Sequence, residues 1–345
     1  MNKKKILANL KNKFYINNII SNNITRLLIF LIAIFIILSI IKPDKFLSIN
    51  NFQSMLAQFP EFGLLSLGIT LVMITGGIDL SVVGIANLAS IIAVKVLLKE
   101  EFQGLPESKM ILVIILAIIA GIIVGFFCGL INGNLVSRFN IPPILTTLGS
   151  MQLFTGTAVI LSGGRAITNL PILYPKIGSA VFFGVIPVSL IIFILAVIIF
   201  GYILRKTSYG LSIFMMGSNP IASKFSGLNN IKLLNITYIS SGILASIAGL
   251  LMLARYSSAR ADYGSAYTLQ SILIVILAGV NPAGGSGSIT GLVLAILILQ
   301  LLSTGINMFS SISSFYRQLI WGAVLIIIMI VNYFVSVRNK RGLVQ

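Results

Sequence analysis

The sequence predicts an all-α integral membrane protein with about ten transmembrane helices. Of its 345 residues, 57% are hydrophobic and only 9% are charged, whereas a soluble domain carries roughly 25% charged residues. Apolar runs such as 111–136 and 181–204 can each cross the hydrocarbon layer, which takes about 20 helical residues. These runs lack the polar and apolar alternation of membrane strands, so we expect helices rather than a barrel.

The spans follow from the apolar runs taken in order. We predict them at 27–41, 61–77, 80–98, 110–135, 142–161, 180–204, 233–254, 268–281, 288–308 and 317–337. Residues 1–26 then form a basic tail, 27–337 the transmembrane domain with an inner loop at about 205–232, and 338–345 a second tail. Outer loops are expected at 43–60, 99–109, 162–179 and 255–267.

Basic residues set the direction of these spans. An even number of spans puts both termini on one side, and loops rich in Lys and Arg stay in the cytoplasm. The tails and inner loops hold Lys3, Lys4, Lys5, Lys11, Lys13, Arg26, Arg138, Arg205, Lys206, Lys224, Lys232, Arg338, Lys340 and Arg341, which is more than half of the 24 Lys and Arg residues. The termini are therefore predicted inside, and the net charge of +17 indicates membrane topology rather than a nucleic-acid partner.

The N-terminal segment is predicted to be a cytoplasmic tail. It contains no acidic residue up to Arg26, and no small-residue cleavage site follows the first apolar run, as a removed signal peptide would require. Beyond this tail, the apolar spans are expected to contact membrane lipid.

Several kinds of chemistry are excluded by composition. The chain has no histidine and a single cysteine, Cys128, so it forms no intrachain disulfide and lacks histidine catalysis or ligation. The sequence contains no G-x-x-x-x-G-K-[ST] motif, the loop that cradles nucleotide phosphates. We therefore expect no metal or cofactor in this chain and no enzymatic activity; a separate ATPase would bind ATP and magnesium.

Two glycine-rich breaks interrupt the apolar pattern. "GGIDLS" (76–81) follows the short span 61–77, and "NPAGGSGS" (281–288) ends the short span 268–281. The segments 64–90 and 270–296 look weakly alike, which suggests an internal repeat. Irregular backbone at membrane depth persists only where protein or a water-filled cavity satisfies it, so paired breaks point to a transport path. A tight turn between closely packed helices is the alternative.

Small residues recur at helical spacing elsewhere. Gly121, Gly125 and Gly129 form one such series, and Ala245 with Gly249 forms another. This spacing lets membrane helices approach closely, so a tightly packed bundle is expected.

Asp79 has two interpretations. Its carboxylate could line the substrate path, or it could cap the restarting helix by accepting from N–H groups near Ser81 and Val82, and the cap is the favoured reading. Other polar residues in or beside the spans have the same two uses, as path lining or as bonds between helices. The path candidates are Thr75, Asp79, Asn132, Thr146, Thr147, Gln152 and Asn281.

The inner loop carries a helix signal of its own. Asn219 followed by Pro220 is typical of a helix start, and Gly227 of a helix end. A helix of about seven residues is too short to hold itself together in water, so it must dock onto the membrane face or a soluble partner.

Four segments, in order, carry a family resemblance. They are "LGITLVMITGGIDLSVVGIANLAS" (67–90), "GLINGNLVSRFNIPPILTTLGSMQLFTG" (129–156), "GSNPIASKFSGLN" (217–229) and "LAGVNPAGGSGSITG" (277–291), the last followed by "SSFYRQLIWG" (313–322). The chain resembles the permease subunits of sugar-type ABC importers, the ribose, xylose and galactose class. The resemblance implies a type II importer-like bundle in the bacterial cytoplasmic (inner) membrane, moving a monosaccharide or similar solute.

The resemblance also implies partners. ATP-binding subunits would dock on the inner loop, a second permease subunit, identical or paralogous, would pair with this one, and an extracytoplasmic sugar-binding protein would deliver the solute. The ATPase-coupling residues it implies are Gly217, Ser218, Asn219, Pro220, Ile221, Ala222, Phe225, Ser226 and Gly227. The alternative is an ion-coupled secondary transporter, a class that tends to need titratable groups at membrane depth, where these spans offer almost none besides Asp79.

Overall fold

The computed structural model describes residues 23–102, 105–182 and 184–309, together with residues 316, 319–323, 326 and 330. The elements on the N-terminal side are α2 (Asn23–Ile41), α3 (Pro43–Phe46), α4 (Ile49–Ile74), α5 (Val82–Leu97), η1 (Glu100–Phe102), α6 (Glu107–Ser137) and α7 (Pro143–Ser162). They are followed by α8 (Leu173–Ser179), β1 (Val181–Phe182), β2 (Ile186–Pro187), α9 (Val188–Lys206), α10 (Ser208–Ser218), α11 (Pro220–Phe225), α12 (Asn230–Tyr256), α13 (Tyr267–Leu277) and α14 (Ile289–Asn307).

The predicted all-α membrane architecture is confirmed. Within the described residues, seven helices are long and apolar enough to cross a membrane, namely α2, α4, α6, α7, α9, α12 and α14. Helices α5 and α13 are apolar but shorter, and they adjoin the two glycine-rich breaks. Most of the tenth predicted span, 317–337, lies outside the described residues.

Helix α4 differs from the prediction. It begins at Ile49, so the expected outer loop 43–60 and the short span 61–77 are both wrong. Polar residues such as Asn50 and Gln53 suggested a loop, but they occupy the outer end of one long helix. Pro60 lies inside that helix, where it removes one backbone hydrogen bond; membrane helices tolerate this when their surroundings satisfy the freed group.

The predicted span 180–204 begins too early. Strand β1 pairs antiparallel with β2 in a short hairpin, and Gly184 between the strands has φ +73°, a conformation that favours glycine. Helix α9 starts only after this hairpin. The residues of the hairpin are as apolar as a span, so hydropathy does not separate it from the helix that follows.

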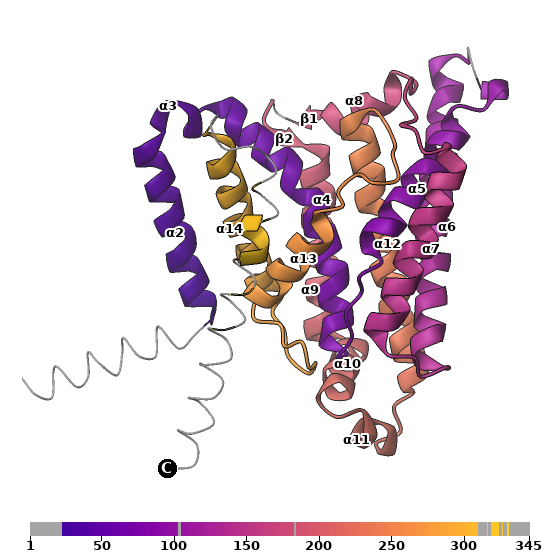
Figure 1. Ribbon diagram of the computed structural model, residues 1–345, viewed down its shortest axis with the longest axis vertical. Helices are drawn as coiled ribbons and strands as arrows, with labels where there is room; N and C mark the ends of the chain where they lie inside the picture. The colour runs from indigo at the N-terminus through magenta and orange to yellow at the C-terminus, as the bar shows by residue number, and fades with distance from the viewer. Residues whose placement is uncertain are drawn as a thin grey trace, which may run out of the picture.

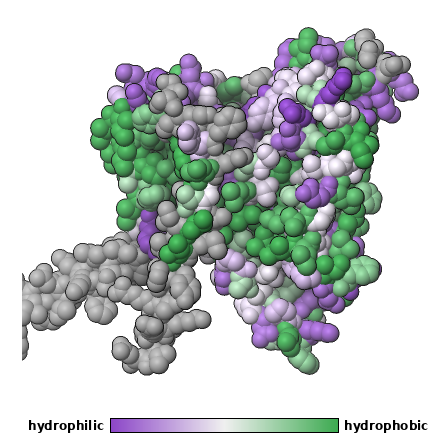
Figure 2. Space-filling model, in the orientation of Figure 1, coloured by the Kyte–Doolittle hydropathy of each residue, from purple (hydrophilic) through white to green (hydrophobic). Residues whose placement is uncertain are grey.

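Helix α4 runs through the centre of the bundle (Figure 1). Every residue from Phe59 to Ile74 is buried, whereas α2, α6, α7 and α9 are largely exposed along their apolar faces. Figure 2 shows these apolar faces as a green band between more hydrophilic ends. Such a band is the surface expected to contact hydrocarbon.

Small residues bring α6 and α12 together, as predicted. A side chain at Gly125 would overlap the carbonyl oxygen of Gly242, and one at Gly129 would come within 2.7 Å of the Ile239 Cα atom. Backbone therefore touches backbone along this pair, as in close membrane-helix packing. Gly249 on α12 makes a similar approach to the backbone of Ala86 on α5.

The two ends of the bundle differ. Helices α3 and α8 and the β1–β2 hairpin lie at one end, and α10 and α11 lie at the other (Figure 1). In the predicted orientation the end with α10 and α11 faces the cytoplasm.

Candidate functional site: a junction of two helix breaks and the inner loop

The first break separates α4 from α5. Helix α4 ends at Ile74, and the Thr75 hydroxyl donates to the carbonyl of Val72 at 2.7 Å. Gly76 has φ +86°, which turns the chain away from the helix axis. The chain then runs without helix as far as Ser81, and α5 starts at Val82.

Asp79 is fully buried in this break. Its Oδ1 atom accepts from the Ser81 backbone N–H at 3.0 Å and from the Ser81 hydroxyl at 2.6 Å. Its Oδ2 atom accepts from the Ser241 hydroxyl of α12 at 2.8 Å. The bond to Ser81 N closes a local turn just before α5, whose N-cap residue is Ser81 itself. The bond to Ser241 ties the break to α12.

Asn132 and Thr147 hold the same break from two other helices. The Asn132 side-chain amide of α6 donates to the Ser81 hydroxyl at 2.8 Å, and the Thr147 hydroxyl of α7 lies 2.9 Å from the carbonyl of Ile78. Three helices therefore fix the break through polar side chains. Sequence reasoning missed Ser241, whose only signal is a hydroxyl within the apolar run of α12.

The remaining path candidates occupy different surroundings. Thr146 is buried next to Thr147, whereas Gln152 is exposed on α7. Asn281 is also exposed and lies in the second break, where its Oδ1 atom accepts from the Ala283 N–H at 3.1 Å. The structure thus gathers Thr75, Asp79, Asn132 and Thr147 at the first break and places Gln152 and Asn281 apart from it.

Tyr238 of α12 also borders the first break. A Cβ atom added at Gly77 would lie 2.8 Å from the Tyr238 hydroxyl. Among the described residues, this hydroxyl and Asn132 Oδ1 are buried side-chain atoms without a hydrogen-bond partner. The break is therefore bordered by polar atoms with unused hydrogen-bonding capacity.

The second break links α13 to α14 by a turn. The Asn281 N–H donates to the carbonyl of Ser286 at 3.1 Å, and the Gly284 N–H donates to Asn281 at 2.9 Å. Ser288 then caps α14 by accepting from the Gly291 N–H at 3.2 Å. The turn is thus closed by its own backbone before the helix restarts.

The two breaks meet at the end of α10. The Gly285 N–H donates to the carbonyl of Ile74 at 2.9 Å, which joins the second break to the last residue of α4. A Cβ atom added at Gly217 on α10 would overlap that same carbonyl oxygen and lie 2.6 Å from Gly285 N. Three segments far apart in the sequence therefore touch through backbone atoms.

The inner loop forms the helix that its sequence predicts. The Asn219 side-chain oxygen accepts from the N–H groups of Ile221 and Ala222 at 3.1 and 3.0 Å, and Pro220 is the first residue of α11. Gly227 has φ +82° just after the helix. The Asn230 side-chain amide of α12 donates to the carbonyl of Pro220 at 2.9 Å, and its oxygen accepts from the Ser223 hydroxyl at 3.0 Å. These two bonds anchor α11 to α12.

Helix α11 exposes its large apolar side chains. Ile221 is 71% exposed and Phe225 is 90% exposed, while Ser223 on the opposite face is buried. Within the residues that the structure describes, this apolar face has no intramolecular cover, and a partner can bury such a surface.

Comparison with known proteins identifies the family. A family model described as "Branched-chain amino acid transport system / permease component" matches residues 51–329. The chain belongs to this permease family. The prediction of a permease subunit of an ABC importer in the inner membrane is thereby confirmed, and the alternative of an ion-coupled secondary transporter is not supported.

Relatives of this permease include import proteins. It is 31% identical over 307 residues, 87% of this chain and 88% of the relative, to "Autoinducer 2 import system permease protein LsrD" of Yersinia pseudotuberculosis serotype O:1b (strain IP 31758). Proteins of the same name from Yersinia enterocolitica (32% over 297 residues, 84% and 86% of the two chains) and Yersinia pestis (strain Pestoides F; 31% over 307 residues, 87% and 88%) are similar. No solved structure matches the chain significantly.

A buried ion pair joins α4 to α12. Glu61 on α4 is 1% exposed, and its carboxylate lies 2.5 Å from Arg255 Nε and 2.8 Å from Arg255 Nη2. The Tyr267 hydroxyl donates to the same carboxylate at 3.4 Å. Arg255 lies at the end of α12, beside the predicted outer loop 255–267, and its guanidinium is paired with Glu61.

Proposed function

We propose that this permease imports a small sugar-like solute, and that separate ATPase subunits dock on α11 and drive the import. The sugar-like solute is supported by the four segments that resemble sugar-type permeases and by relatives whose names refer to autoinducer 2 import. The family description refers to branched-chain amino acids, so the solute class is the part of the proposal that most needs a direct test.

The observation that carries the ATPase proposal is the exposure of Ile221 and Phe225 on α11. This helix has only six residues, and short helices gain their stability from packing rather than from propensity. Asn219 and Asn230 anchor one face of α11, and its apolar face remains open. A groove on an ATPase would bury that face, as amphipathic helices are buried in recognition grooves.

The contact of Gly217 with Ile74 and Gly285 would transmit a movement of the docked helix to the bundle. Because these contacts are between backbone atoms, a displacement of α10 and α11 has no flexible side chain to absorb it. The displacement would therefore reach the ends of α4 and the second break together. ATP binding in the partner would bias a two-state bundle through its different affinity for the two states, which is the requirement for alternating access.

The polar atoms around the first break fit a neutral solute. Asn132 and Tyr238 present unused hydrogen-bonding capacity there, and a solute in transit calls for weak, replaceable hydrogen bonds. ATP and magnesium would be bound by the ATPase and not by this chain. A second permease subunit and an extracytoplasmic binding protein would complete the importer.

The ATPase proposal is tested by placing charge on α11. We expect Ile221→Asp with Phe225→Asp to abolish co-purification of the ATPase while leaving membrane insertion and thermal stability unchanged, because a buried unpaired charge is costly at an interface. Ile172→Asp is the matched control, since Ile172 is 78% exposed at the opposite, outer end. Normal ATPase co-purification with the double variant would refute the docking assignment.

The solute is tested by what accompanies the permease. We would solubilise the chain from its native membrane, isolate it and identify the co-purifying proteins by mass spectrometry. A P-loop ATPase and a binding protein that holds a sugar-like ligand support the proposal. A binding protein specific for branched-chain amino acids would overturn the solute class while leaving the ATPase proposal in place.

A further inference from the structure

A groove separates the inner ends of α9 and α14. It has a volume of about 490 Å³ and is lined by Ile198 and Gly201 of α9 and by Ile289, Val293 and Leu294 of α14. A Cβ atom added at Gly201 would lie 3.9 Å from the nearest side-chain carbon of Ile289. Glycine at this position therefore leaves space between the two helices that a larger side chain would fill.

The groove is apolar toward the centre of the membrane. On α9, the apolar lining consists of Val197 and Ile198, and Ile198 is 61% exposed. These side chains belong to the apolar band that contacts hydrocarbon. Tyr202, 64% exposed, follows about one turn later, at the level where amphipathic aromatic side chains meet the membrane surface. The groove therefore extends from the hydrocarbon region to the polar boundary.

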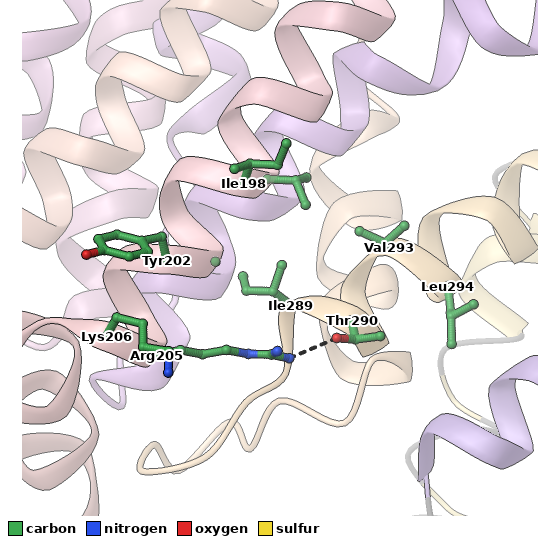
Figure 3. A pocket seen from close by; sticks show the side chains of 10 residues that line it. Ile198, Tyr202, Arg205, Lys206, Ile289, Thr290, Val293 and Leu294 are labelled. Carbon is green, nitrogen blue, oxygen red and sulfur yellow. Dashed lines mark hydrogen bonds between the residues drawn. The ribbon is translucent and has the colours of Figure 1, made fainter.

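The mouth of the groove is positively charged. Arg205 and Lys206 are the last residues of α9 and line this mouth. Figure 3 shows Arg205 reaching from α9 across to α14, where its Nη2 atom donates to the Thr290 hydroxyl at 2.9 Å. Among the described residues, no acidic side chain lines the groove, so no carboxylate of this part of the chain neutralises the two cations there.

An anionic phospholipid matches each part of this arrangement. Its phosphate would bind Arg205 and Lys206, since a guanidinium presents several donors to phosphate oxygens in fixed geometry. One acyl chain would lie along Ile198, Val293 and Leu294. Basic pockets between membrane helices on the cytoplasmic side are suited to such head groups. We propose that the α9–α14 groove is a binding site for an anionic phospholipid of the inner leaflet.

Because of where the groove lies, a bound lipid would link two helices that lead to the junction of the breaks. Helix α9 leads directly into α10, and α14 begins directly after the second break. A lipid held between α9 and α14 would thus connect the elements that meet at Gly217 and Gly285. This consequence rests on the proposed function, but the binding of the lipid does not.

The test measures lipid retention on the isolated permease, without ATPase or solute. The purified chain is equilibrated with dioleoyl phosphatidylglycerol or dioleoyl phosphatidylcholine in a mild detergent, and bound lipid is counted by native mass spectrometry. We expect preferential retention of phosphatidylglycerol, and a loss of about tenfold or more in its affinity for Arg205→Gln with Lys206→Gln, since charged hydrogen bonds contribute most of it.

Two further variants separate the groove from general charge. Gly201→Leu fills the space for the acyl chain and leaves every charge in place, so it should also lose phosphatidylglycerol. Lys224→Gln removes an inner-side charge on α11, outside the groove, and should retain the lipid as the parent chain does. Equal affinity of all variants, or an equal loss with Lys224→Gln, would overturn the proposal.

The same preparation distinguishes a protein occupant from a lipid. If another copy of the permease covered the groove, Gly201→Leu would shift the chain from dimer to monomer at unchanged lipid retention, and the lipid assignment would be wrong. If the double variant fails to fold, as judged by thermal unfolding, Gly201→Leu alone decides. Failure of the ATPase to dock on α11 would leave these lipid measurements unaffected.

Discussion

Replacing Arg255 with methionine should destabilise the permease far more than replacing Glu61 with glutamine. Glu61 is 1% exposed, and its carboxylate accepts one hydrogen bond from Arg255 Nη2 at 2.8 Å and forms an ion pair with Arg255 Nε. Removing the guanidinium leaves a buried carboxylate with only Tyr267 as a donor, and breaking a buried pair in this way costs about 3–5 kcal/mol. Glu61→Gln instead leaves a guanidinium that is 23% exposed and can reach water, so we expect a loss of about 1–3 kcal/mol.

The double variant Glu61→Gln with Arg255→Met supplies the decisive comparison. It removes both charges, so no buried charge is left without a partner, and it should be more stable than Arg255→Met alone. Thermal unfolding of the purified chain in detergent measures all three. Arg260→Met is the control, because Arg260 pairs with Asp262 on the surface at 2.8 Å with both side chains more than half exposed, and such pairs contribute about 0–1 kcal/mol. A double variant as unstable as the sum of the single variants would refute the reasoning, since coupled neighbours should not be additive.

Two predictions concern the junction. Asp79→Asn should retain transport and thermal stability, because the amide oxygen can accept from Ser81 and the amide nitrogen can donate to Ser241. Asp79→Leu should lose about 1–3 kcal/mol of stability for each group left unpaired. Loss of transport by a stable Asp79→Asn variant would instead assign the carboxylate to the transport path. Gly217→Ala should lower the amount of solute imported per ATP hydrolysed in proteoliposomes, and it should lower stability by about 1–3 kcal/mol through overpacking. Gly149→Ala is the control, because an added Cβ there meets nothing within 4 Å, and it should leave import per ATP and stability unchanged. Equal import per ATP in the two variants would contradict the proposed role of Gly217.

Sequence patterns predicted the features that depend on local chemistry. Hydropathy located nine helices in the described residues, because any run that crosses hydrocarbon must be apolar. Asn219, Pro220 and Gly227 predicted α11 correctly, since capping and turn geometry are properties of a few adjacent residues. Gly125 and Gly129 predicted close helix packing for a similar reason, because only small side chains allow backbones to touch.

Features that depend on distant partners were not predicted. Ser241 is 162 positions from Asp79, and Arg255 is 194 positions from Glu61; nothing near either residue indicates its partner. The start of α4 was misplaced because hydropathy measures contact with lipid, whereas its polar first turns lie at the outer end of the bundle. Asn281, a predicted path residue, lies in a turn whose backbone bonds to α4 rather than beside Asp79.

The break at residues 75–81 combines two mechanical properties that favour a gate over a simple turn. Asn132 of α6, Thr147 of α7 and Ser241 of α12 hold its centre by hydrogen bonds, so the break has a single defined conformation. Its beginning, in contrast, is fixed by backbone contacts from α10 and the second break. Packed elements of this kind shift between discrete arrangements rather than deforming smoothly. We therefore expect a change imposed at Gly217 to be taken up where side-chain hydrogen bonds can exchange partners, as the donors and acceptors around Asp79 can.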